Sequence, residues 1–171
     1  IEASFANGRN FANKVWNAGR FTLMSVGDDP LRSLDEVADD LEPMDRWILS
    51  RLDRVVESVT NGMDRFRLHE VAETLYHFFW GEVADWYLEL VKDRLRAPEG
   101  DAGREAARTT LVTVLDQTLR MLHPIMPFVT TALWDRLPWP STGADERRPD
   151  DLIVASWPEC DAAQRDPDSE A

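Results

Sequence analysis

The feature that most limits how this chain can fold is the stretch from residue 68 to about 96, where apolar side chains recur every three or four positions. That spacing is the period of an α-helix. A helix with so wide an apolar surface must be packed by other helices on several sides. We therefore expect the third helix of the chain to be the hub of a bundle, with its apolar residues in the core: Ala72, Leu75, Tyr76, Phe79, Trp80, Val83, Trp86, Tyr87, Leu90 and Val91.

Four further segments have the helical period. We expect helices over residues 9–24, 44–66, 101–122 and 127–137, with a turn at Asn7-Gly8 before the first of them and a stop near Gly27. Prolines mark several of the boundaries, because proline is tolerated in the first turn of a helix and breaks its interior. The acidic segment 28–43 is expected to be a solvated connection with a short helical turn around 34–41.

The C-terminal part of the chain has little helical signal. We expect a loop over 141–151, a brief extended run at Leu152-Ile153-Val154, and a disordered tail, since the last thirteen residues hold five acids and one base. The predicted fold is an all-α bundle of about five helices. It is predicted to occupy residues 1–158, and residues 159–171 form an acidic tail that leads toward an absent C-terminal region.

Composition narrows the class of protein further. No apolar run approaches the ~20 residues of a membrane span, and no signal-peptide pattern opens the chain. The single cysteine, Cys160, excludes an intramolecular disulfide framework and favours a reducing, cytoplasmic setting. Because the chain starts without methionine and within a helical pattern, we expect it to be a piece of a longer protein.

The first helix carries an unusual surface. The whole chain has 32 acids and 19 bases, a net charge of −13, whereas residues 1–25 hold three bases and one acid. On a helical wheel, one arc collects cations, amides and aromatics and has no carboxylate: Arg9, Asn10, Asn13, Lys14, Trp16, Asn17, Arg20 and Phe21. Such a surface on an acidic protein suits an anionic ligand that carries bases. The residue spacing alone leaves open that the asparagines satisfy backbone groups and the cations are merely solvated.

Other candidate sites are weak. His69, Glu73 and His77 lie at i, i+4 and i+8, as metal ligands on one helix can, but no second acid–histidine pair exists elsewhere. Cys160 lies in a polar tail without a nearby histidine, and no phosphate-binding glycine motif is present. The sequence therefore indicates neither a catalytic site nor a bound metal or cofactor.

Five blocks in the same order resemble the anticodon-binding helical domain of class I aminoacyl-tRNA synthetases of the valyl type. They are GRNFANKVWNAGRFTLM (8–24), DRWILSRL (45–52), LYHFFWGEVADWYLELVKDRL (75–95), LHPIMPFVTTALWDRLP (122–138) and LIVASWPE (152–159). The resemblance covers nearly the whole chain up to Glu159. Isoleucyl-type enzymes are the nearest alternative, but arginine and threonine tend to stand in them where this chain has Trp16 and Ala18.

The resemblance implies a parent enzyme that attaches valine to its tRNA with ATP, through a valyl-adenylate made in a separate catalytic domain. This chain would be non-catalytic, would need no cofactor, and would hold the valine tRNA anticodon stem-loop through the first-helix surface. Its other partners would be the catalytic domain and the coiled coil of the parent chain, and we expect a monomer with no membrane contact. A protein-interaction module and a metal-dependent helical enzyme remain as alternatives from other functional classes.

Overall fold

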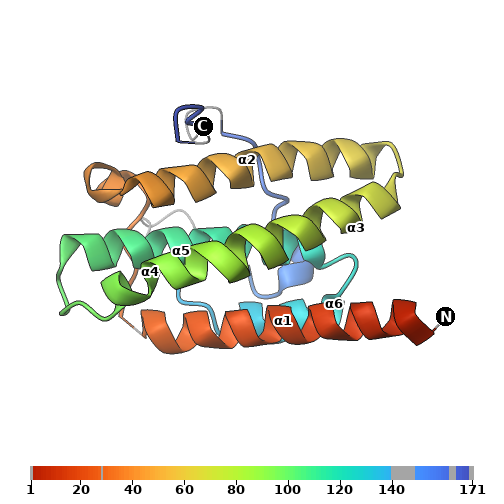
Figure 1. Ribbon diagram of the computed structural model, residues 1–171, viewed down its shortest axis with the longest axis horizontal. Helices are drawn as coiled ribbons and strands as arrows, with labels where there is room; N and C mark the ends of the chain where they lie inside the picture. The colour runs from red at the N-terminus through yellow and green to blue at the C-terminus, as the bar shows by residue number, and fades with distance from the viewer. Residues whose placement is uncertain (1, 28, 140–148, 162–164, 170–171) are drawn as a thin grey trace.

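The computed structural model describes residues 2–27, 29–139, 149–161 and 165–169. These ranges form an all-α bundle, which confirms the predicted fold class. Figure 1 shows α1 and α2 along opposite edges of the bundle, and between them α3, η2 and α4 run as one continuous helix, called here the long helix. The elements are α1 (Glu2–Val26), η1 (Asp35–Asp40), α2 (Pro43–Asp64), α3 (Leu68–His77), η2 (Phe78–Tyr87), α4 (Leu88–Leu95), α5 (Ala102–Leu122), α6 (Pro127–Trp134) and η3 (Leu152–Val154).

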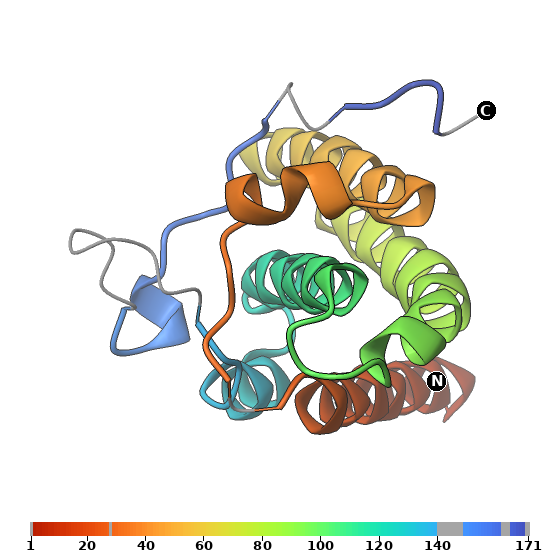
Figure 2. The same cartoon turned by 90° about the vertical axis from the view of Figure 1, so that its left-hand side faces the viewer.

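The centre of the bundle is α5 and not the long helix. Figure 2 shows α5 enclosed by α1, α2, the long helix and α6. Small residues such as Ala106, Ala107 and Thr110 are fully buried on α5 and let its neighbours approach closely. The buried hydroxyl of Thr118 donates to the carbonyl of Val114 at 2.6 Å, so a polar side chain costs little there. The expectation that the third helix is the hub is therefore wrong. The apolar surface of the long helix suggested a central position, but α5, with its small buried residues, is surrounded more closely (Figure 2).

The long helix contains a π-helical segment, η2, and this changes which of its residues face the core. The amide of Leu88 donates to the carbonyl of Val83, five residues back. The extra residue in that turn brings Tyr87 and Val91 to the core, where a regular α-helix would bring Trp86 and Leu90. Trp86 is 65% exposed and Trp80 only half-buried, so the prediction that both are core residues is wrong for Trp86.

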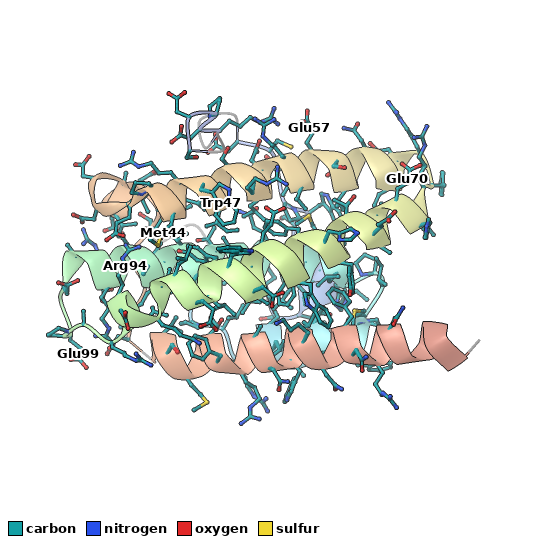
Figure 3. All side chains as sticks on the ribbon, in the orientation of Figure 1. Met44, Trp47, Glu57, Glu70, Arg94 and Glu99 are labelled. Atoms are coloured by element: carbon teal, nitrogen blue, oxygen red, sulfur yellow. The ribbon has the colours of Figure 1, made fainter. Side chains whose placement is uncertain are left out.

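The outward side of η2 borders an open apolar cavity of about 550 Å³. Figure 3 shows Met44 and Trp47 on the side of α2 that faces the long helix, and both line this cavity. Trp86 and Leu90 line its opposite wall. Trp86 and Leu90 are therefore shared with α2 rather than isolated in solvent.

The boundaries of α1 differ from the prediction at one end only. No turn interrupts the helix at Asn7-Gly8, since α1 begins at Glu2 and Gly8 has no positive φ. Packing of the helix overrides the intrinsic cost of an internal glycine, which is about 1 kcal/mol. Gly27, with φ of +70°, ends α1 where the sequence predicts.

A buried arginine of α5 fixes the C-terminal end of α1. Arg108, 1% exposed, donates from Nε to the carbonyl of Val26 at 2.7 Å and from Nη2 to that of Asp29 at 2.9 Å. Its charge is balanced by Glu105, 2.8 Å away on the same helix. Arg108 thus satisfies carbonyls at and just after the end of α1, and fixes the direction in which the chain leaves this helix.

A second buried polar cluster joins the start of α2 to the long helix. The hydroxyl of Tyr87 donates to Oδ1 of Asp45 at 2.7 Å, and Nη1 of Arg94 donates to Oδ2 of the same carboxylate at 2.7 Å. Burial, together with the adjacent Asp45 carboxylate, raises the pKa of Tyr87 well above its ordinary value. These hydrogen bonds fix the orientation of the long helix about its own axis, at and just after the end of the π-helical segment.

The connecting segments agree with the sequence-based expectations only in part. The short helical turn expected near 34–41 is confirmed as η1, whereas Leu152–Val154 is a 3-10 turn and not an extended run. Residues 140–148, most of the predicted loop, lie outside the described residues.

The described part of the tail packs on α2 instead of being free. The amide of Asp161 donates to the buried carboxylate of Asp53 at 2.6 Å, and the amide of Asp166 donates to the hydroxyl of Ser50 at 3.0 Å. Arg165 forms ion pairs with Asp53 and with Glu57. The expectation of disorder is therefore wrong for residues 159–161 and 165–169.

None of the described helices has the length and hydropathy of a membrane span.

Candidate RNA interface on α1

Five of the eight residues that the sequence indicates on α1 are exposed together, and they form one stripe along the helix. The stripe, called here the polar stripe, lies opposite the buried seam of α1, which includes Phe11, Val15 and Thr22. No ion pair of Arg9 or Arg20 is present in the described part of the chain. The polar stripe consists of Arg9, Asn10, Asn13, Asn17 and Arg20.

Lys14 lies at the edge of this stripe, on the side that faces the long helix. Its ammonium group is 2.6 Å from Oδ1 of Asp85 and 5.4 Å from the ring centroid of Trp80. This arc of α1 has no carboxylate of its own, but η2 supplies one at its edge. Lys14 is half-buried and Asp85 is exposed, so the ion pair is worth about 0–1 kcal/mol and can be exchanged for another anion at small cost.

Phe21 lies two turns further along the same side of α1. The ammonium group of Lys92, on α4, is 5.5 Å from the centroid of its ring and 2.5 Å from Oε1 of Glu89. Phe21 is half-buried and also packs against the core, so only part of its ring is available to a ligand.

Trp16 is separated from these residues. On the helical wheel Lys14 and Phe21 project toward the long helix, whereas Trp16 projects to the other side of the polar stripe. The helix approaches α6 closely at Gly19, where an added Cβ would lie 2.6 Å from Cδ1 of Leu133. Trp16 is half-buried and packs against the core cluster, so it does not share a pocket with Phe21.

Sequence reasoning missed the residues that the long helix contributes. Asp85, Glu89 and Lys92 have the spacing i, i+4, i+7 and so form one polar edge of the helix beside α1. That spacing was the available signal, but only the packing of α1 against η2 and α4 shows that this edge borders the candidate site. The exposed arginines and amides can bind phosphates and base edges. The edge of the long helix adds one paired cation, Lys92, and a partly exposed Trp80.

The other candidate residues do not assemble into a site. Nε2 of His77 lies 3.9 Å from Oε1 of Glu73, and both side chains are exposed. In the ranges that the structure describes, no group of three histidine, cysteine or acidic side chains could hold a metal ion. Burial and the nearby carboxylates of Asp53 and Glu57 raise the pKa of the Cys160 thiol, which disfavours its reactive thiolate.

Comparison with known proteins identifies the family of this chain. The family model for the anticodon-binding domain of tRNA ligase matches residues 45–171. Valine–tRNA ligase of Staphylococcus saprophyticus is 40% identical over 154 residues, which cover 90% of this chain and 17% of that protein. The valine–tRNA ligase of Fervidobacterium nodosum is 40% identical over 162 residues, 95% of this chain and 17% of its own length. That of Thermotoga maritima is 42% identical over 151 residues, 88% of this chain and 16% of its own length.

These matches differ in how they treat α1. The family model begins at residue 45 and leaves α1 out, whereas the alignment of 162 residues leaves at most nine of the 171 residues unmatched and so includes most of α1. The chain spans about one-sixth of the length of these relatives. Because the family model covers well over half of the chain, the chain belongs to the family of anticodon-binding domains of tRNA ligases.

Proposed function

We propose that this chain binds the anticodon stem-loop of a valine tRNA through the polar stripe of α1 and the adjoining edge of the long helix. The observation that carries the proposal is the joint exposure of Arg9 and Arg20 with three asparagines on an otherwise acidic protein. The arginines would hold backbone phosphates, while the amides would reach base edges of the single-stranded loop. The acidic remainder would repel RNA and confine it to this surface.

The border between α1 and the long helix has a separate role in the proposed interface. Lys14 and Lys92 are held in ion pairs with Asp85 and Glu89, so they add little net charge to the free surface. When a phosphate or a base approaches, either lysine can exchange its carboxylate for the ligand at low cost. Phe21, beside Lys92, is the aromatic residue best placed to stack on a base at this edge.

The activity of the longer protein is part of the same proposal. The relatives that match this chain bear the name valine–tRNA ligase, and we infer a parent that charges a valine tRNA with ATP in the cytoplasm, using a catalytic domain outside this chain. The bundle would position the anticodon end, and the acceptor end would reach that domain. A monomer suffices for this role.

A titration with two RNA hairpins tests the proposal. Valine anticodons share adenine and cytosine at their second and third positions, so the control stem-loop has these two bases exchanged. We expect the chain to bind the valine stem-loop with a dissociation constant on the order of 10⁻⁴–10⁻⁶ M, weakening steeply as salt is raised, and to bind the control more weakly. Equal binding of both hairpins would remove the claim that the anticodon is read.

A further inference from the structure

The turn between α2 and α3 contains an aromatic residue in a conformation that normally belongs to glycine. Phe66 has φ of +56°, the left-handed region. Its amide donates to the carbonyl of Met63 at 3.0 Å, and the amide of Arg67 donates to that of Gly62 at 2.8 Å. This pair of bonds is the Schellman motif that ends many helices, and Phe66 occupies the position in it where glycine is usual. A Cβ at that position strains the backbone.

Nothing in the described fold compensates for this strain. The side chain of Phe66 is 87% exposed, so its ring buries almost no surface within the bundle. Glycine at this position would make the turn easier to form, without loss of any packing. The presence of a phenylalanine is therefore explained by a contact outside the described chain.

The surroundings of Phe66 indicate the chemistry of that contact. The five consecutive residues 65–69, called here the hairpin tip, are all exposed and include two arginines and one histidine, with an exposed acid on each side, Asp64 and Glu70. Arg65 and Arg67, the residues on either side of Phe66 in the sequence, line a recess of about 300 Å³ that has no apolar side chain. A protein partner that buried the ring would be expected to meet an apolar recess, whereas a polar recess suits a hydrated phosphate. The recess is lined by Ser58, Asn61, Gly62, Arg65, Arg67, Glu70 and Thr74.

The long helix connects the hairpin tip to α1. The rings of Phe11, on α1, and Tyr76, on α3, are 5.1 Å apart. Tyr76 is eight residues, or about 12 Å, along α3 from the first residue of that helix. Figure 1 shows the α2–α3 turn and the start of α1 at the same end of the bundle, and Figure 3 labels Glu70 there.

We propose that the hairpin tip is a second RNA contact, at which Phe66 stacks on an unpaired base and Arg65 binds a neighbouring phosphate in the polar recess. This contact rests on the proposed function, since the RNA is the same tRNA that α1 holds. This second contact would extend the proposed interface beyond the anticodon loop to a further part of the tRNA. Arg67 is ion-paired with Glu70 at 3.4 Å and contributes less net charge than Arg65.

The substitution Phe66→Gly separates binding from folding, because the two readouts should move in opposite directions. Relief of the strained backbone should raise the melting temperature of the chain. Loss of the stacked ring should weaken binding of a full-length valine tRNA transcript about 5- to 150-fold. Phe128→Ala is the matched control, since Phe128 is 91% exposed on α6, and it should leave binding unchanged.

Each result decides a different question. A higher melting temperature with unchanged tRNA binding, while Arg20→Ala still weakens binding, would overturn the contact at the hairpin tip, keep the proposed function, and leave a protein surface as the partner of Phe66. A lower melting temperature would overturn the inference in another way, because Phe66 would then be explained by the fold. If the wild-type chain binds no tRNA, the proposed function fails and the second contact fails with it.

Discussion

The ammonium group of Lys14 and the carboxylate of Asp85 are 2.6 Å apart, although 71 positions separate them in the sequence. This pair joins α1 to the π-helical segment at the border of the proposed RNA interface. It also decides how much of the charge of α1 is free to attract RNA: Arg9 and Arg20 are available, whereas Lys14 is already balanced.

Removal of the carboxylate should therefore strengthen RNA binding. In Asp85→Asn we expect the valine stem-loop to bind more tightly by about 0.5–1 kcal/mol, because Lys14 no longer has to leave a partner. Asp93→Asn is the matched control, since it removes the same charge from an exposed part of the long helix, 95% accessible. An equal gain in both variants would assign the effect to net charge and would contradict a specific role for the Lys14–Asp85 pair.

The two tryptophans Trp86 and Trp134 should differ strongly in their contribution to stability. Trp86→Ala should change the free energy of unfolding by about 0.5 kcal/mol or less, because the side chain is already 65% exposed. Trp134 is 1% exposed, and its truncation should cost about 3–5 kcal/mol through the cavity that it leaves. Urea denaturation of both variants measures the difference, and a large loss in Trp86→Ala would place that residue back in the core.

Two glycines of α1 should respond to alanine with opposite signs. An added Cβ at Gly8 meets nothing within 4 Å, so Gly8→Ala should stabilise the helix by about 0.5–1 kcal/mol. At Gly19 the same Cβ would lie 2.6 Å from Leu133, and overpacking should destabilise the chain by about 1–3 kcal/mol. Thermal melting of both variants checks this, and destabilisation by Gly8→Ala would support a turn at Asn7-Gly8 after all.

The raised pKa of Tyr87 gives the protein a characteristic loss of stability in alkali. The folded state holds the phenol proton above pH 10, the ordinary pKa, while the unfolded state releases it. Stability from this group is therefore complete below about pH 10 and declines as pH rises from there through the folded-state pKa. Denaturant titrations at a series of alkaline pH values should show a steeper decline in wild type than in Tyr87→Phe. An equal decline of the free energy of unfolding in the two proteins would mean that the pKa of Tyr87 is not raised in the folded state.

Much of the fold follows from local sequence signals, and what was missed depended on contacts between elements. The helix α2 begins at Pro43 and has a regular apolar period, so its limits could be predicted closely. The π-helical turn in η2 has no comparable signal, and the single extra residue reversed the environment of Trp86. The central place of α5 was missed because its buried alanines and threonines are not hydrophobic enough to stand out.

The same distinction applies to the candidate site. The polar stripe could be predicted because it depends only on the period of one helix. The pairing of Lys14 with Asp85 and the cover of Phe21 by Lys92 could not, since they depend on how α1 packs against a helix distant in sequence. The family resemblance led us to propose α1 as the RNA-binding helix, and the packing shows which of its cations are free of ion pairs among the described residues.

The salt dependence of RNA binding tests the central claim most directly. The logarithm of the association constant for the valine stem-loop should be measured against the logarithm of salt concentration for wild type, the double variant Arg9→Ala/Arg20→Ala, and Arg96→Ala, whose arginine is exposed at the far end of the long helix. We expect the double variant to lose about two units of slope and the Arg96→Ala control to keep the wild-type slope. If the double variant kept the wild-type slope and affinity, RNA would bind elsewhere, and the polar stripe of α1 would not be its binding surface.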